Sequence, residues 1–307
     1  MYLSEILKEM GIDRFSTIDE REFDYLSLLL PTDKERMLSF MDNLVYKEDI
    51  PGNLSMLLVK EDMVSELGNR DYGLCLVADP RDLFFRLHNY LCDREGYMRP
   101  VFASRIHPSA SISDQSFISD TNVVIGRDVV IEPFVMVYPN TVIEDHTIIR
   151  AGTTIGGMGF EFKRSKNIIM SVAHAGGVVI GDYVEIQNNS CIDRAVYPWD
   201  DTVIGSYSKV NNFVHIAHGC KIGKRAMIVA HVSLGGRVVV GDDVWLGTGV
   251  SIRNGITIGD GARVNMGSVV TRSVGAGESV TGNFAIPHDQ FLARLKKDLQ
   301  SLSDKES

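Results

Sequence analysis

The sequence predicts a mainly β protein built around a parallel β-helix of hexapeptide repeats, with a small α/β domain before it and a helix after it. Twelve aliphatic residues follow one another at six-residue intervals between Ile204 and Val270. A glycine or another small or polar residue usually follows the aliphatic one, as in IGSY, IGKR and IGDG. This period fits neither an amphipathic helix nor an alternating strand, and it is typical of a parallel β-helix.

In such a fold each hexad supplies a short strand and a turn, and three hexads close one triangular coil. We expect the aliphatic residue to point inward and to stack on the residue 18 positions later, so that the core is a column of aliphatic side chains. The twelve positions are Ile204, Val210, Ile216, Ile222, Ile228, Leu234, Val240, Leu246, Ile252, Ile258, Val264 and Val270. The same period in another phase runs from Ile125 to Ile155, with a looser lead-in from Ile106.

Two segments interrupt the repeat, at residues 156–177 and 195–200. Long ordered loops on a rigid scaffold often bind ligands, although a loop of this kind is also tolerated as a mere surface excursion. The first segment carries Lys163, Arg164 and Lys166 beside Phe160 and Phe162. We therefore predict that it forms a wall of a site where basic side chains meet phosphates.

The two ends follow other patterns. LSEILKEM and PRDLFFRLHNYL are typical of amphipathic helices, whereas LSMLLVKE and GLCLVADP are typical of strands. A terminal helix is expected from about Asp289, with its apolar side packed on a neighbouring subunit or coil. The predicted domains are an α/β nucleotide-binding domain over residues 1–102, the β-helix over 103–282 and a helical tail over 283–307. The α/β domain lacks the GxGxxG signature of a Rossmann domain.

The composition of the chain limits the classes of partner that it is expected to bind. A net charge of −9 offers no broad basic field for nucleic acid or anionic lipid. The four cysteines form no CxxC pair, and the charged first residues do not resemble a secretory signal. No apolar run approaches the length of a membrane span. We therefore expect a cytoplasmic protein with small, diffusible partners.

Two histidines in VNNFVHIAHGCKIG need a separate explanation. Because Ile216 is expected to point inward, His215 and His218 are expected on the outer or corner surface of the coil. Gly236 lies 18 residues after His218, so the two should be neighbours along the axis. A base beside an accessible backbone N–H is the pairing that acyl transfer needs, because one takes a proton and the other stabilises an oxyanion.

The sequence resembles the UDP-3-O-acylglucosamine N-acyltransferases of lipid A synthesis and their relatives that act on nucleotide-linked amino sugars. FMDNLVY is similar to the family segment that holds the uracil ring, VVIGDYVEIQNNSCIDRA matches a segment ending in Ile-Asp-Arg, and HIAHGCKIG matches the motif of the catalytic histidine. The resemblance covers nearly the whole chain and implies a left-handed β-helix. It also implies a homotrimer with active sites between neighbouring β-helices.

The resemblance assigns roles to individual residues. His218 would be the general base and the Gly236 amide the oxyanion donor, while Phe40, Asn43 and Tyr46 would hold the nucleotide base. Histidine suits this task because its ordinary pKa lies near 6.5. Further contacts with the substrate or acyl donor are expected from His215, Asn211, Asp193, Arg272, Lys163 and Arg164.

Departures from the family pattern point to a specialised relative. The acid that the lipid A enzymes carry seven residues before the histidine is Asn211 here, so we expect the imidazolium to lack a charged partner. A second histidine of those enzymes aligns with Gly255. The sequence therefore predicts an N-acyltransferase for a dTDP- or UDP-linked amino-deoxysugar in cell-surface glycan synthesis, with acyl-CoA as donor and without a resident cofactor or metal.

Three alternatives stay open at this stage. One is the lipid A enzyme itself, which uses an acyl carrier protein. Another is a zinc-dependent carbonic anhydrase of the same fold, with His215, His218 and His231 as ligands, although their spacing does not match that family. The third is a non-catalytic β-helix that binds a partner, against which the nucleotide-site match counts.

Overall fold

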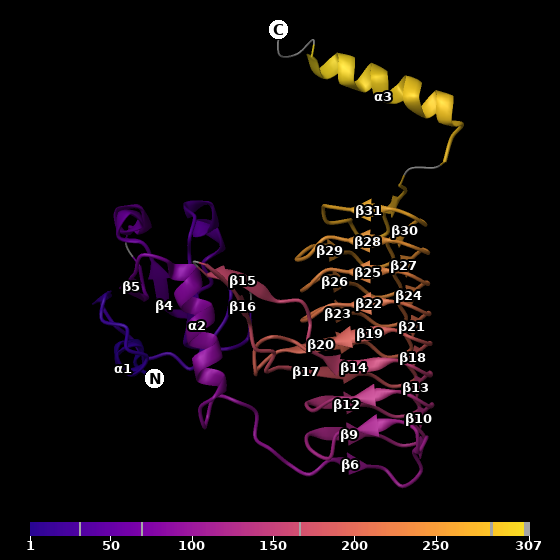
Figure 1. Ribbon diagram of the computed structural model, residues 1–307, viewed down its shortest axis with the longest axis horizontal. Coiled ribbons are helices and arrows are strands. Elements are labelled where there is room, and N and C mark those ends of the chain that lie inside the picture. The colour runs from indigo at the N-terminus through magenta and orange to yellow at the C-terminus, as the bar shows by residue number, and fades with distance from the viewer. Residues whose placement is uncertain (31, 69, 166, 283–284, 304–307) are drawn as a thin grey trace.

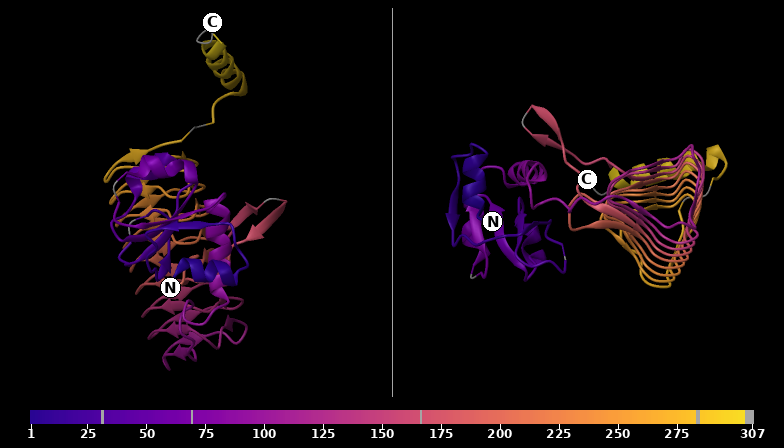
Figure 2. Two further views of the ribbon diagram at one scale, coloured as in Figure 1. Left: turned by 90° about the vertical axis from the view of Figure 1, so that its left-hand side faces the viewer. Right: turned by 90° about the horizontal axis from the view of Figure 1, so that it is seen from below.

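A triangular column of stacked coils runs through the molecule, and an α/β unit lies against its side (Figures 1 and 2). The computed structural model describes residues 1–30, 32–68, 70–165, 167–282 and 285–303. The domain boundaries expected from the sequence stay predictions.

The N-terminal unit is a five-stranded sheet in the order β1-β5-β4-β3-β2, in which only β1 runs antiparallel to its neighbour. The helices and strands predicted from the sequence are confirmed. Its elements are α1 (Leu3–Glu9), β1 (Ser16–Ile18), β2 (Tyr25–Leu26), β3 (Met37–Phe40), the 3₁₀ helices η1 (Leu44–Asp49) and η2 (Glu61–Leu67), β4 (Leu54–Val59), β5 (Gly73–Leu76) and α2 (Pro80–Cys92).

Three parallel sheets form the faces of the column. The first face holds β6 (Arg105–Ile106), β9 (Val123–Ile125), β12 (Thr141–Ile143), β17 (Gly177–Ile180), β20 (Asp201–Ile204), β23 (Lys221–Ile222), β26 (Val239–Val240) and β29 (Thr257–Ile258). The second holds β7 (Ser111–Ile112), β10 (Val130–Ile131), β13 (Ile148–Ile149), β18 (Glu185–Ile186), β21 (Lys209–Val210), β24 (Met227–Ile228), β27 (Trp245–Leu246), β30 (Arg263–Val264) and β32 (Ser279–Val280). The third holds β8 (Phe117–Ile118), β11 (Met136–Val137), β14 (Thr154–Gly157), β19 (Cys191–Asp193), β22 (His215–Ile216), β25 (Ser233–Leu234), β28 (Ser251–Ile252) and β31 (Val269–Val270).

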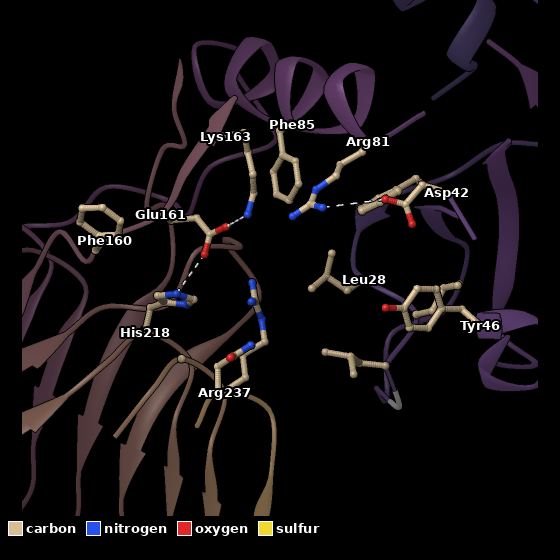
Figure 3. Close-up of a pocket in the computed structure, with 15 residues that line it drawn as sticks. Leu28, Asp42, Tyr46, Arg81, Phe85, Phe160, Glu161, Lys163, His218 and Arg237 are labelled. Atoms are coloured by element: carbon tan, nitrogen blue, oxygen red, sulfur yellow. Dashed lines mark ion pairs between the residues drawn. The ribbon is translucent and has the colours of Figure 1, made fainter. Parts of the chain in front are cut away.

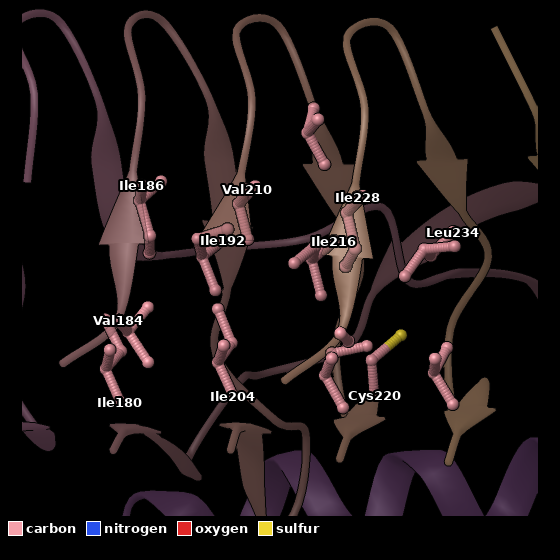
Figure 4. Close-up of a cluster of buried hydrophobic side chains, with 14 of the residues drawn as sticks. Ile180, Val184, Ile186, Ile192, Ile204, Val210, Ile216, Cys220, Ile228 and Leu234 are labelled. Atoms are coloured by element: carbon pink, nitrogen blue, oxygen red, sulfur yellow. The ribbon is translucent and has the colours of Figure 1, made fainter. Parts of the chain in front are cut away.

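The aliphatic column is confirmed. Ile204 pairs with Ile222 and Ile216 pairs with Leu234, each 18 residues along the chain. All twelve periodic positions are buried, with exposed fractions of 0 to 7%. Figure 4 shows part of this column, with Ile204, Val210, Ile216, Ile228 and Leu234 stacked inside the coils. The six-residue period therefore fixes which residue lies above which.

Both interruptions leave the column at one corner, between the third face and the first. Ile143 pairs with Ile180, so the first interrupted coil spans 37 residues, 19 more than 18. Ile180 pairs with Ile204, so the next coil spans 24 residues, six more than 18. The first insertion forms an antiparallel hairpin of β15 (Phe162–Ser165) and β16 (Ile168–Ser171), which projects from the column (Figure 2).

The two insertions hold the N-terminal unit against the column. His88 and Asn89 of α2 bond to the backbone of Ala173, with an Nε2–O distance of 2.9 Å and an N–Oδ1 distance of 2.9 Å. From the second insertion, Trp199 Nε1 donates to the carbonyl of Leu26 at 2.8 Å. Tyr197 is buried in the same core as the N-terminal helices. The inserted segments are therefore structural anchors as well as loops.

The terminal helix α3 (His288–Ser303) begins one residue before the expected position. Phe291, Leu292 and Leu295 are 52%, 48% and 43% exposed, and the helix projects beyond the last coils (Figure 1). Packing on a coil of the same chain is therefore wrong, because the apolar side of the helix stays exposed to solvent. Packing on a neighbouring subunit stays a prediction. Among the described helices, none has the length and apolarity that crossing a bilayer demands.

Removing one side chain from the column should destabilise the whole coil. Ile216 is fully buried, and Ile216→Ala should lower the free energy of unfolding by about 2 to 5 kcal/mol, because the surrounding coils cannot collapse into the cavity. Val239→Ala, at an outward position that is 41% exposed, is the matched control and should cost under about 1 kcal/mol. Urea unfolding measures both values, and equal losses would contradict the inward column.

Acid should weaken the anchoring of the N-terminal unit. Burial lowers the pKa of His88 to about 4 in the folded protein. An unfolded histidine titrates near pH 6.5. Between about pH 6.5 and pH 4 the unfolded chain therefore binds more protons than the folded chain does. The free energy of unfolding should therefore fall across that window. The free energy of unfolding of the His88→Gln variant should fall less steeply. Urea midpoints at pH 7 and pH 5 measure the difference, and identical slopes would contradict this role of His88.

Candidate functional site

A cavity of about 520 Å³ lies between the N-terminal unit and the column. Figure 3 shows side chains from both units pointing into it. Its lining residues are Leu28, Leu29, Leu30, Phe40, Asp42, Tyr46, Arg81, Phe85, Phe160, Glu161, Lys163, His218, Gly236, Arg237 and Asn254. Residues of one chain therefore line both walls, and closure of the site by a neighbouring protomer stays a prediction.

His218 and Gly236 are neighbours on consecutive coils, as the spacing predicts. The Arg237 amide donates to the His218 carbonyl at 2.9 Å, which locks the two coils in register. A Cβ placed on Gly236 would lie 2.5 Å from Cε1 of the imidazole, so only glycine lets the ring sit there. Within the described ranges, no group accepts a hydrogen bond from the Gly236 amide. The pair therefore places an imidazole beside a backbone N–H that has no acceptor among the described residues, at the wall of the cavity.

His218 is buried and not on an exposed surface. It does lie at the outer corner of its coil, but Glu161 and His174 of the inserted segment, on either side of the hairpin, contact it and leave it 6% exposed. The expectation of a surface position was wrong because an interruption of the repeat can fold back over a later coil. Burial excludes water, which strengthens the electrostatic interactions of the ring.

Glu161 supplies the charged partner of His218. Its Oε2 lies 3.0 Å from His218 Nε2, and its Oε1 contacts the Lys163 ammonium. Burial raises the pKa of Glu161, but the hydrogen bonds from His218 and Lys163 outweigh it and lower that pKa to about 2. Glu161 is therefore an anion at neutral pH.

The prediction that the imidazolium lacks a charged partner is thus wrong. Asn211 lies on the second face, beside Lys209 and Glu185, and is not among the residues that line the His218 cavity. Its side-chain oxygen accepts from the Asn212 amide at 2.6 Å. The acid reaches His218 from the inserted segment instead of from the preceding coil.

A second buried histidine lies behind His218. The rings of His174 and His218 meet edge to face with centroids 5.6 Å apart. Burial, and then the proximity of His218, lower the pKa of His174 to about 4, so it is neutral at pH 7. Its Nδ1 lies 3.1 Å from the Val172 carbonyl. A neutral ring that donates from Nδ1 presents an unprotonated Nε2 to its other side.

His215 belongs to a different pair. Its Nε2 lies 2.9 Å from Oδ2 of the buried Asp193, and this hydrogen bond raises the pKa of His215. Neither residue lines the cavity. The structure therefore brings these two predicted residues together, but beside the site and not within it.

The predicted nucleotide residues lie at the far end of the cavity. The Phe40 ring packs against Phe84 at 5.0 Å, and Tyr46 is 48% exposed. Asn43 accepts a hydrogen bond from the Val45 amide at 3.0 Å and so caps η1. It lines an adjoining cavity of about 420 Å³ that shares Tyr46 with the first.

The remaining predicted residues divide between the site and the surface. Lys163 lines the cavity, with its ammonium 4.5 Å from the centre of the Phe85 ring. Arg164 and Arg272 are exposed and do not line it. Lys166 lies outside the described residues. His231 stacks on Phe213 at 5.2 Å, away from the other two histidines once considered as metal ligands.

Four residues in or beside the cavity were not predicted from the sequence. They are Glu161, His174, Arg81 and Arg237. A signal for two of them was present, because Glu161 and His174 lie in the insertion that leaves the column two coils before His218, at the same corner. Arg237 directly follows the predicted Gly236.

The repeats of the column match a known class of protein. The family described as bacterial transferase hexapeptide (six repeats) matches residues 122–157, 201–236 and 237–272. Together with the three parallel faces, this match makes the fold a left-handed parallel β-helix of the hexapeptide type, as expected. Among solved structures, the UDP-N-acetylglucosamine acyltransferase from Campylobacter jejuni has a TM-score of 0.49 and 24% identity, over 58% of this chain and 72% of that one.

Curated relatives define the family more closely. The UDP-3-O-acylglucosamine N-acyltransferase of Delftia acidovorans is 30% identical over 282 residues, which are 87% of this chain and 83% of that protein. The UDP-3-O-acylglucosamine N-acyltransferase 2 of Legionella pneumophila (strain Lens) is 42% identical over 90 residues. That alignment spans 29% of this chain and only 26% of the relative's length. The chain belongs to the UDP-3-O-acylglucosamine N-acyltransferase family.

Adding one methyl group at Gly236 should disable the site without unfolding the coil. The new Cβ of Gly236→Ala would overlap the His218 ring, which is the flexible partner and must turn away. We expect at least about 100-fold slower acyl transfer, comparable to the loss of an oxyanion donor, with an unfolding temperature close to that of the wild type. Gly52→Ala, with nothing within 4 Å of the added atom, is the control. Unimpaired turnover in Gly236→Ala would contradict the pairing.

Proposed function

We propose that the chain is an N-acyltransferase that moves an acyl group from a thioester to the amino group of UDP-3-O-acylglucosamine, a step of lipid A synthesis. One observation carries this proposal. A single cavity joins the residues that match the family's nucleotide segment, Phe40 and Tyr46, to the His218–Gly236 pair. Membership in the family supports the same acceptor.

A dTDP-linked amino-deoxyhexose, the acceptor first expected, is less well supported. That expectation depended in part on the missing acid at Asn211, and Glu161 now provides an acid to the same imidazole. The relatives that the chain resembles are named for a UDP-linked acceptor. The lipid A reaction therefore replaces the dTDP-sugar reaction as the leading proposal.

Two arginines suit the diphosphate of the acceptor. Arg81 and Arg237 lie between Tyr46 and His218 in Figure 3, where a diphosphate would follow the base. Arg81 Nη1 is 3.9 Å from Asp42 Oδ2, and Arg237 forms no ion pair with a carboxylate of the described residues. The Arg237 guanidinium can offer paired donors in a fixed plane to a phosphate, and Arg81 would exchange its single long contact with Asp42 for such a pair. Arg81 and Arg237 are therefore proposed to hold the diphosphate.

The chemistry follows from the pair at the corner. His218 accepts a proton from the acceptor nitrogen, because only the free amine attacks the thioester carbonyl. The Gly236 amide then donates to the oxyanion of the tetrahedral intermediate. Collapse of the intermediate breaks the carbon–sulfur bond and forms the amide. The acyl carrier protein or acyl-CoA thioester acts as co-substrate in this scheme.

The assembly and location are part of the proposal. A homotrimer is proposed because the family resemblance implies one, and the exposed apolar residues of α3 offer a surface for it. A cytoplasmic location is proposed because both candidate acyl donors are cytoplasmic molecules in the resemblance.

Replacing the proposed base tests the function. His218→Ala should lower turnover of UDP-3-O-acylglucosamine with a hydroxyacyl carrier-protein thioester at least about 100-fold, while the unfolding temperature stays near that of the wild type. His231→Ala, at another corner, is the control and should keep its turnover. Free thiol release measures the rate.

The same assay distinguishes the acceptors. Parallel reactions contain a dTDP-linked amino-deoxyhexose with acetyl-CoA. Release of thiol only in those reactions would contradict the UDP assignment. Near wild-type rates in His218→Ala would remove His218 from the mechanism.

A further inference from the structure

Neither nitrogen of His218 is open to a substrate in this structure. Nε2 is 3.0 Å from the Glu161 carboxylate, and Nδ1 is buried and has no hydrogen-bond partner among the described residues. The Glu161 contact faces the cavity (Figure 3). An acceptor that reaches His218 must therefore enter at Nε2 and compete with Glu161.

Glu161 is an anion that needs donors on both oxygens. Its side chain is 9% exposed, and among the described residues its carboxylate is paired with His218 and Lys163. A buried carboxylate that loses a partner without replacement pays the full cost of an unpaired charge. Any acceptor that separates Glu161 from His218 must therefore give the carboxylate a new donor.

An ammonium group gives the carboxylate both a donor and a compensating charge, whereas a hydroxyl group gives it only a donor. An ammonium has three N–H donors, so it can donate to Glu161 Oε2 and to His218 Nε2 together. A hydroxyl has one O–H donor, so it can satisfy both groups only by donating to Glu161 and accepting from a protonated His218 Nε2, which then cannot act as the base. The positive charge of the ammonium also compensates the carboxylate, and a hydroxyl carries none.

We propose that Glu161 and His218 together form an ammonium-binding site that selects an amino acceptor over a hydroxyl acceptor at the same position. This inference depends on the proposed function and names the acceptor class that the site recognises. This binding mode needs His218 to accept at Nε2. The neighbouring His174 ring, with its centroid 5.6 Å from that of His218, is neutral at pH 7, so it adds no second positive charge beside the bound ammonium.

Glu161 is then a residue that determines specificity for the acceptor, and the protons of the acyl transfer can be followed from the bound ammonium. The bound ammonium gives one proton to His218 Nε2, and the free amine attacks the thioester carbonyl. The nitrogen–carbon bond forms and the carbon–sulfur bond breaks, while the imidazolium proton passes to the departing thiolate. The second nitrogen proton leaves to water. Ammonium and thioester thus give amide, thiol and one released proton.

Isothermal titration with two matched nucleotide sugars tests the proposal. UDP-glucosamine carries an ammonium, and UDP-glucose carries a hydroxyl on the same carbon. At a pH where the amine is protonated, the wild-type chain should bind UDP-glucosamine about 10- to 100-fold more tightly, as charge-assisted hydrogen bonds predict. Glu161→Gln should remove most of this preference and leave the affinity for UDP unchanged.

Two further variants serve as controls. Glu161→Asp keeps the charge and should keep part of the preference, which guards against a loss caused by misfolding. Glu185→Gln, which removes a carboxylate paired with Arg150 on another face, should keep the full preference.

Three results would overturn the inference. Equal affinities in the wild type, or a preference that survives in Glu161→Gln, would each refute it while leaving the proposed function intact. A wild-type chain that binds neither UDP nor either sugar would overturn the proposed function as well.

Discussion

The vertical register of the coils is the constraint on which the site depends. Inward aliphatic residues 18 positions apart stack on one another, so residues at the same corner of successive coils have fixed neighbours. His218 and Gly236 are one such pair. The two insertions leave the column at that corner in the two coils before His218. The N-terminal unit that they anchor is therefore held beside the histidine.

Periodicity explains what the sequence could predict. The aliphatic column and the His218–Gly236 pairing both follow from counting residues, because a stacked coil converts sequence spacing directly into spatial contact. The helices α1 and α2 were recognisable by local patterns. Glu161 was not, because an insertion has no period, and its path depends on contacts with α2 that lie far away in the sequence. The shared corner of insertion and histidine was the available clue.

The acid beside His218 comes from a different place in the sequence than the family pattern predicts. The family acid that precedes the histidine is Asn211 here, and the carboxylate comes instead from the inserted segment. An acid from that segment lies on the cavity side of the ring, where the proposed acceptor would arrive. In the proposed reaction the same group both holds the imidazole and contacts the acceptor nitrogen, which an acid behind the ring could not do.

The central claim is that one chain joins the nucleotide site to the catalytic corner. A crystal structure of the protein with bound UDP tests it most directly. The base should lie against Phe40 and Tyr46, with the diphosphate beside Arg81 and Arg237 and directed toward His218 of the same chain. A nucleotide bound elsewhere, or one whose diphosphate points away from His218 of its own chain, would contradict the account.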